Sequence, residues 1–226
     1  MAAKCFYITG TDTGVGKTVL TVLLTRQLRA RGLAVAALKP LCSGGREDAE
    51  ALHLALGGEL SLDAINPWHF RLPLAPLLAA RQEGKRVQLR DALAHVRQFC
   101  DRRDVLLIEG AGGLLSPLGE DFTSRELIIA LRSTPIIVSP NRLGAVNQVM
   151  LTLAALPPRA ARSAKIVLVS PSQAHSASRS NVHFLEEKFG ANQVLVMPWF
   201  ANPENPRLES SNLKFIRALL DTLALG

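Results

Sequence analysis

The stretch Gly10-Thr-Asp-Thr-Gly-Val-Gly-Lys-Thr18 follows a strand-like run at residues 4–9 and leads into a helix-like segment at residues 17–31. Its three glycines allow a tight loop whose backbone N–H groups point inward at phosphate oxygens. Lys17 is placed to reach the β- and γ-phosphates, and the Thr18 hydroxyl to ligate Mg²⁺. The helix adds its positive end. This stretch therefore predicts a phosphate-binding loop for a nucleoside triphosphate with Mg²⁺.

Outward from this loop, short apolar runs alternate with longer helical ones along the chain. The strand-like runs are residues 4–9, 34–38, 104–108, 135–139, 165–170 and 193–197. Their Val, Ile, Leu and Ala content is typical of parallel strands covered on both faces. The helix-like stretches are residues 17–31, 47–56, 74–82, 89–100, 123–132, 144–156, 178–189 and 207–224. This alternation predicts one α/β domain over residues 1–226, a three-layer α/β/α fold of the P-loop NTPase type with a mostly parallel central sheet.

The composition suits an ordinary globular domain. The 226 residues are 48% hydrophobic and 20% charged, which is enough to bury a core. The sequence has no run of about 18 uncharged apolar residues, so it predicts no membrane span. The N-terminus lacks the pattern of a signal peptide. Three widely spaced cysteines indicate free thiols in a reducing compartment. We therefore expect a cytoplasmic protein without a membrane partner.

The net charge of +7 raises the question of a nucleic-acid partner. The basic residues are scattered along the chain, and they are not interleaved with its 11 aromatic residues. Solvated helix faces explain this pattern better than a nucleic-acid surface does. An excess of basic over acidic residues also suits a site that holds phosphate and carboxylate groups.

Ligands of such sheets bind beyond the carboxyl ends of the strands, so the residues that follow each strand are the candidates for a site. These segments are Gly10–Thr18, Lys39–Gly45, Glu109–Gly113, Ser139–Gly144, Ser170–Pro171 and Pro198–Glu204. Most of the unusual residues of the chain lie in them.

Three charged residues in or near these segments are candidates for chemistry. Pro40 fixes the turn after the second strand, which presents the Lys39 ammonium at the sheet edge, where it can neutralise charge during phosphoryl transfer. Glu109 precedes a glycine-rich turn and is placed like the acidic metal partner of nucleotide-binding loops. Asp48 lies at a predicted helix start and is either a helix cap or a magnesium ligand. On chemistry alone, residues 141–147 are ordinary turn and cap residues.

Taken together, these residues resemble the dethiobiotin synthetases, ATP-dependent cyclo-ligases of biotin synthesis. The resemblance spans nearly the whole chain. It rests on Gly10–Thr18, Lys39-Pro-Leu-Cys-Ser-Gly44, Asn66-Pro67 with Pro73-Leu-Ala-Pro76, Glu109-Gly-Ala-Gly-Gly113 with Pro117-Leu118, and Asn141-Arg-Leu-Gly144 with Asn147. It implies a reaction in which 7,8-diaminononanoate captures CO₂ as a carbamate. ATP phosphorylates the carbamate to a carbamic-phosphoric anhydride, and the second amine closes the ureido ring.

The resemblance also implies roles for individual residues. The catalytic residues are Thr13, Lys17, Lys39 and Ser43. The nucleotide-binding residues are Gly14, Val15, Gly16, Lys17, Thr18, Val19, Asp48, Glu109, Gly110, Ala111, Gly112, Ser170, Pro198, Trp199, Phe200 and Glu204. The Mg²⁺ ligands are Thr18, Asp48 and Glu109, and the diamine contacts are Lys39, Ser43, Pro76, Leu143 and Asn147. Family members are homodimers whose diamine site borrows residues from the second subunit.

The sequence departs from the family pattern on the side of the base. Ser170, followed by Pro171, stands where the family commonly has an asparagine for the adenine edge. Val138-Ser139-Pro140 replaces the more usual Val-Val-Gly, and the segment between Ser43 and Asp48 is short. These departures suggest looser base selection, with some use of CTP or GTP.

Four other functions use the same loop. A partner-regulated P-loop ATPase predicts an exposed amphipathic or basic surface helix, and residues 207–224 do not have that character. A small-molecule kinase predicts an arginine-rich lid, which does not stand out; an amide-forming ligase of the same superfamily is a related alternative. A non-catalytic nucleotide-binding subunit has no need for the whole set of candidate residues, which are Lys17, Thr18, Lys39, Ser43 and Glu109.

Overall fold

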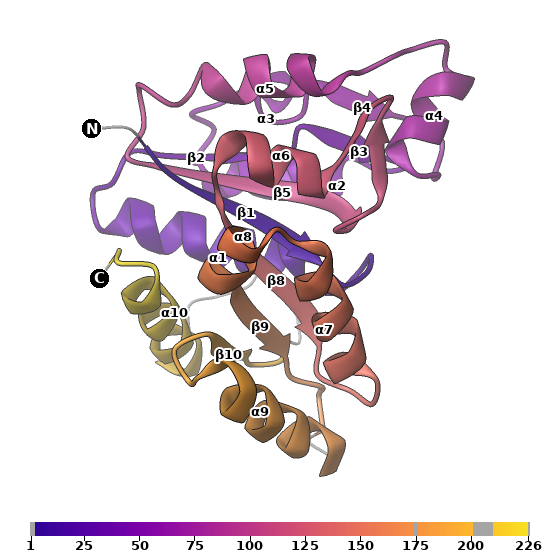
Figure 1. Ribbon diagram of the computed structural model, residues 1–226. Helices are drawn as coiled ribbons and strands as arrows, with labels where there is room; N and C mark the ends of the chain where they lie inside the picture. The colour runs from indigo at the N-terminus through magenta and orange to yellow at the C-terminus, as the bar shows by residue number, and fades with distance from the viewer. Residues whose placement is uncertain (1–2, 174–175, 201–209, 226) are drawn as a thin grey trace.

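The computed structural model describes residues 3–173, 176–200 and 210–225. Six parallel strands form one sheet in the order β10-β9-β8-β1-β5-β2 (Figure 1). They are β1 (Lys4–Gly10), β2 (Val35–Leu38), β5 (Val105–Gly113), β8 (Thr134–Pro140), β9 (Lys165–Val169) and β10 (Val194–Met197). All six predicted strands are confirmed, and β5 extends through the glycine-rich segment that was predicted as a turn.

Helices cover both faces of the sheet, which confirms the three-layer α/β/α prediction (Figure 1). They are α1 (Lys17–Ala30), α2 (Glu47–Ala55), α3 (Leu62–Ile65), α4 (Pro76–Gln82), α5 (Leu89–Arg97), α6 (Ser124–Leu131), α7 (Ala145–Ala155), α8 (Pro158–Ser163), α9 (Ser176–Phe189) and α10 (Ser210–Thr222). Helix α5 ends three residues before the predicted position. The predictions missed α3 and α8, which are too short to show a helical period.

The two layers arise from the alternation of side chains along each strand. In β1, Phe6 and Ile8 pack into one core with α1, α2 and α10, whereas Tyr7 packs into the other core with α5, α6 and α7. All three side chains are at most 4% exposed. Because every central strand is buried on both faces, its sequence reads as a continuous apolar run.

Two short ribbons lie beyond the central sheet, and the predictions did not include them. Strands β3 (Leu41–Ser43) and β4 (Trp68–Phe70) pair in parallel. Strands β6 (Pro117–Gly119) and β7 (Phe122–Thr123) pair antiparallel. The β3–β4 ribbon brings the segment around residue 66 alongside the turn after β2. Asn66 therefore lies against the backbone of Lys39.

Two features bear on the sequence-based expectations of environment. Cys5, Cys42 and Cys100 are free thiols, as predicted. Within the described ranges, no helix is both long enough and apolar enough to span a bilayer.

Candidate active site

The loop predicted to bind phosphate lies between β1 and α1 and is held against the neighbouring strand ends. The Thr11 N–H donates to the Val138 carbonyl at 2.9 Å. A Cβ atom on Gly10 would lie 2.7 Å from the Asp12 carbonyl oxygen, so this first glycine allows the loop to fold onto itself. Gly16 has φ of 99° and precedes the first turn of α1, a conformation that favours glycine. Gly10 and Gly16 therefore allow the tight loop that the sequence predicted between β1 and α1.

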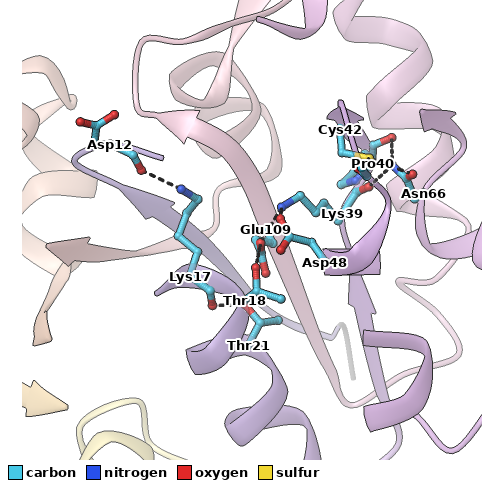
Figure 2. A network of polar contacts seen from close by, with 11 residues as sticks. Asp12, Lys17, Thr18, Thr21, Lys39, Pro40, Cys42, Asp48, Asn66 and Glu109 are labelled. Atoms are coloured by element: carbon cyan, nitrogen blue, oxygen red, sulfur yellow. Dashed lines mark hydrogen bonds and ion pairs between the residues drawn. The ribbon is translucent and has the colours of Figure 1, made fainter. Parts of the chain in front are cut away.

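Lys17 lies under the loop and is 6% exposed. Its ammonium donates to the Asp12 carbonyl at 2.8 Å, across the loop opening (Figure 2). Burial lowers the pKa of Lys17, and the nearby Glu109 carboxylate opposes that shift. A triphosphate in the loop would offer this ammonium charged partners in place of one carbonyl.

Beside the loop, Lys39 and two carboxylates form a compact charged cluster (Figure 2). The Lys39 ammonium donates to Glu109 Oε1 at 2.8 Å and also to Asp48 Oδ2. Thr18 Oγ1 donates to the same Glu109 oxygen at 2.7 Å. Lys39 and Glu109 are 4% and 1% exposed, whereas the Asp48 side chain is half-exposed. The end of β2, strand β5 and helices α1 and α2 therefore each contribute one residue to the cluster.

The structure excludes one of the two local interpretations of Asp48, that of a helix cap. Helix α2 begins at Glu47 after Arg46, so Asp48 lies inside the first turn and does not hold the cap position. Its carboxylate is paired with Lys39. Burial by itself would raise the pKa of Asp48, but the Lys39 ammonium holds it below its ordinary value of 3.8. Asp48 is therefore an ionised member of the cluster.

The same balance keeps Lys39 charged. Burial by itself would lower the pKa of the ammonium, but the Glu109 and Asp48 carboxylates raise it above its ordinary value of 10.5. A buried charge is tolerated when it is paired and hydrogen-bonded. Lys39 is therefore a fixed positive charge at the edge of the phosphate loop.

The oxygen atoms of the cluster fit a magnesium ion. Thr18, Asp48 and Glu109 supply a hydroxyl and two carboxylates, the hard ligands that Mg²⁺ prefers. Glu109 Oε2 is buried and has no hydrogen-bond partner within the described part of the chain. No group of three or more His, Cys, Asp or Glu that could hold a metal occurs in the described ranges. A site with few protein ligands suits an ion that is held partly by substrate phosphates.

The remaining residues predicted on the phosphate side surround this cluster. Thr13 is exposed at the loop tip, and its methyl carbon lies 3.9 Å from the Cβ position that Gly112 lacks. Gly110 packs against Tyr7 and Ser124, where a Cβ would lie 2.7 Å from the Ser124 hydroxyl. Val15 is buried, while Val19 and Ala111 are partly buried. The loop and the end of β5 therefore share one edge of the sheet.

The residues predicted to contact the diamine are spread more widely. The Ser43 hydroxyl donates to the Leu74 carbonyl, which ties β3 to the segment before α4. Pro76 is buried at the start of α4. Leu143 is 84% exposed, and Asn147 is exposed on α7. Neither residue belongs to the cluster around Lys39, whose ammonium contacts Asp48 and Glu109.

The residues predicted on the base side lie at the ends of β9 and β10. The Ser170 N–H donates to the Met197 carbonyl at 2.8 Å. Ser170 and Pro171 line a shallow pocket with Asn141 and Arg179. Pro198, Trp199 and Phe200 follow β10; Trp199 is 52% exposed, and Phe200 packs against the core. Glu204 lies outside the described residues.

The sequence did not predict a role for Asn66, which contacts the backbone of Lys39, or for Arg46, which contacts Asn66. Asn66 is fully buried, and its side chain bonds the Lys39 carbonyl (Figure 2). The Arg46 guanidinium bonds Asn66. The dipeptide Asn66-Pro67 was the only signal in the sequence, and it gave no role to the asparagine.

The loop, the parallel sheet and the charged cluster at its edge define a P-loop nucleotide-binding protein. A family model described as an AAA domain matches residues 4–207. The ATP-dependent dethiobiotin synthetase BioD of Anaeromyxobacter sp. (strain Fw109-5) is 43% identical over 166 residues, covering 72% of this chain and 74% of that protein. The corresponding protein of Marinobacter nauticus is 34% identical and covers 92% of this chain and 93% of its own. The chain belongs to the ATP-dependent dethiobiotin synthetase family, and it is an ATP-dependent ligase of biotin biosynthesis.

A solved structure extends the comparison at the level of fold. The MinD cell division protein of Aquifex aeolicus superposes with a TM-score of 0.58 at 16% identity. The match covers 98% of this chain and 96% of that chain. At this identity the likeness confirms the P-loop NTPase fold and carries no statement about activity.

Proposed function

We propose that this ligase forms the ureido ring of dethiobiotin from 7,8-diaminononanoate, CO₂ and ATP, with Mg²⁺. The observation that carries the proposal is the cluster of Lys39, Glu109 and Thr18 beside the phosphate loop. A plain nucleotide-binding loop needs Lys17 and Thr18 but has no need for a second buried ammonium. Lys39 supplies positive charge next to the place where the γ-phosphate would lie.

The phosphate side of the proposed reaction uses the loop and the charged cluster beside it. Thr18, Asp48 and Glu109 would hold Mg²⁺, which when bound neutralises negative charge on the triphosphate. Lys17 exchanges its bond to the Asp12 carbonyl for charged phosphate oxygens. The backbone N–H groups of the loop would supply further donors to the phosphate oxygens.

The proposed chemistry has three steps. One amine of the diamine attacks CO₂ and loses a proton, which gives a carbamate. A carbamate oxygen then attacks the γ-phosphorus, ADP leaves, and a carbamic-phosphoric anhydride forms. The second amine attacks the carbamate carbon, loses a proton, and expels inorganic phosphate as the ring closes.

Lys39 acts in these steps through its charge. As an ammonium it stabilises the carbamate and the charge that moves to the transferring phosphoryl group. The hydroxyls of Thr13 and Ser43 are placed to hydrogen-bond the carbamate or the amine end. The Ser43 hydroxyl proton is donated to Leu74, so its oxygen lone pairs are the part that faces a substrate donor.

We further propose that the enzyme is a homodimer with a shared diamine site. Leu143, before α7, and Leu151, on α7, are 84% and 62% exposed, and they are apolar side chains that a second subunit could cover. Asn147 is exposed on the same helix. A second subunit that covers this surface would bring Leu143 and Asn147 to the substrate of its partner.

The test is an assay with ATP, bicarbonate, Mg²⁺ and 7,8-diaminononanoate in which dethiobiotin is measured by mass spectrometry. We expect product that depends on all four components, and phosphate release that rises when the diamine is added. Absence of dethiobiotin, with phosphate release unaffected by the diamine, would contradict the proposal. A Lys39→Ala variant is expected to bind nucleotide and to lose most turnover.

A further inference from the structure

The backbone of Lys39 and Pro40 lies beyond the end of β2 and outside the hydrogen bonds of the central sheet. The chain around residue 66 takes the place of a strand partner. The Lys39 N–H donates to the Ile65 carbonyl at 3.0 Å, and the Trp68 N–H donates to the Pro40 carbonyl at 3.1 Å. Asn66 Nδ2 donates to the Lys39 carbonyl at 2.7 Å and to the Pro40 carbonyl at 3.4 Å. Pro40 has no N–H, so the polar backbone of this turn is satisfied.

The other end of the Asn66 amide is also engaged. Asn66 Oδ1 accepts from Arg46 Nε at 3.2 Å and from the Cys42 thiol at 3.1 Å. Burial raises the pKa of the Cys42 thiol to about 11, so the thiol keeps the proton that it donates. An asparagine amide has two donor hydrogens and an acceptor oxygen with two lone pairs. In this fully buried side chain each has a partner, which fixes the orientation of the amide.

Arg46 links the same asparagine to α2. A terminal nitrogen of its guanidinium donates to the Asn66 backbone carbonyl at 2.8 Å. Arg46 is the residue that precedes α2, and Asp48 follows it in the first turn. Asn66 therefore contacts the turn that carries Lys39 and also Arg46, the residue that leads into the helix carrying Asp48.

We propose that Asn66 is a positioning residue of the ligase, which sets where the Lys39 ammonium lies relative to Asp48 and Glu109. It does so by holding the Lys39–Pro40 turn directly and the start of α2 through Arg46. This inference rests on the proposed function, because the effect on turnover acts through Lys39. Asn66 touches neither the phosphate loop nor a catalytic side chain in the described structure.

A merely structural role predicts something different. A buried asparagine that only stabilises the fold would, when replaced, lower stability and weaken every activity alike. A positioning role predicts a lower kcat with unchanged nucleotide affinity, because the phosphate loop is built from other elements. It also predicts that the effect disappears once Lys39 is removed.

The experiment is a double-mutant cycle with Asn66→Ser and Lys39→Ala, measured as dethiobiotin formation and as nucleotide affinity. Since a displacement near 1 Å can reduce turnover about 100-fold, we expect Asn66→Ser to lower kcat by about 10- to 100-fold. Nucleotide Kd should change by less than about threefold. In the Lys39→Ala background, Asn66→Ser should reduce kcat by less than about threefold, because residues that act as one unit are not additive.

A milder variant and a matched control accompany the cycle. Arg46→Met removes the guanidinium contacts with Asn66 from a partly exposed position and leaves Asn66 itself in place. Since it loosens the amide and does not delete it, we expect a kcat about three- to tenfold lower. Asp63→Asn removes the charged partner of Arg46 at a side chain that is 87% exposed, and should leave kcat within about twofold.

Two results would overturn the inference. One is an equal loss of kcat from Asn66→Ser with and without Lys39. The other is an Arg46→Met variant with the kcat of the wild type, which decides the matter if Asn66→Ser does not fold. A wild-type protein that makes no dethiobiotin contradicts the proposed function, and with it this inference, before any variant is compared.

Discussion

Replacing Lys39 by methionine tests the charged cluster in the folded protein without substrate. The substitution keeps the length of the aliphatic stem and removes the ammonium that pairs with Glu109 at 2.8 Å. Glu109 is 1% exposed, so its carboxylate would lose its cation where water cannot replace it. Removing one partner of a buried pair costs about 3–5 kcal/mol. Asp48 contributes little of this, since its half-exposed carboxylate can be hydrated.

We expect the lower end of that range, about 3 kcal/mol, because the Thr18 hydroxyl still donates to Glu109 after the change. For a chain of this size, the loss corresponds to a melting temperature about 6–12 °C lower. The double variant Lys39→Met with Glu109→Gln removes the unpaired charge as well. It should recover at least half of the lost stability, because a neutral pair can replace a buried ion pair at little cost.

The assay is urea unfolding of the nucleotide-free protein at neutral pH, with Lys188→Met as a control. Lys188 is exposed in the last turn of α9, so its replacement should change the free energy of unfolding by less than about 0.5 kcal/mol. A Lys39→Met variant within about 1 kcal/mol of the wild type would refute the reasoning. A double variant less stable than the single one would refute it as well.

Three further predictions address other parts of the molecule. Glu126 closes a capping box with Thr123 at the start of α6, and although burial raises its pKa, hydrogen bonds from Thr123 hold it below 4.5. Its contribution to stability is therefore present above pH 4.5 and lost as the pH falls through the lowered pKa; Glu126→Ala should cost about 1 kcal/mol at neutral pH, and the difference from the wild type in urea unfolding should vanish in acid. Because Ser170 replaces the asparagine expected at the base edge, CTP and GTP should support measurable turnover, and a kcat/KM for ATP higher by orders of magnitude would exclude this. Leu151→Asp should convert a homodimer to monomers in analytical ultracentrifugation; an unchanged sedimentation coefficient would place the subunit contact elsewhere.

The fold could be predicted from the sequence because the buried strands of the central sheet are also its short apolar runs. Each parallel strand is covered on both faces, so it appears as a short Val- and Ile-rich run between polar segments. The ribbons β3–β4 and β6–β7 were not predictable in this way, since pairs of two or three residues carry no period. The strand-end rule placed the phosphate loop, Lys39 and Glu109 at one edge without any knowledge of their contacts.

What the sequence could not show is the direction of side chains within that edge. Asp48 lies near the start of a helix in either interpretation, and only the tertiary structure shows its carboxylate against Lys39. Asn66 is separated from Lys39 by 26 residues of mostly surface chain, so no local pattern relates the two. Contacts of this kind depend on how the β3–β4 ribbon folds back, which is a tertiary property.

The path of oxygen during turnover tests the central claim most directly. When C¹⁸O₂ freshly dissolved in ordinary water is supplied with ATP, Mg²⁺ and 7,8-diaminononanoate, the attacking carbamate oxygen becomes part of the phosphate that is expelled on ring closure. The account predicts inorganic phosphate that carries one ¹⁸O atom for each dethiobiotin formed. Phosphate without ¹⁸O would contradict it, because water would then have supplied the oxygen that attacks ATP and the carbamate would never have been phosphorylated.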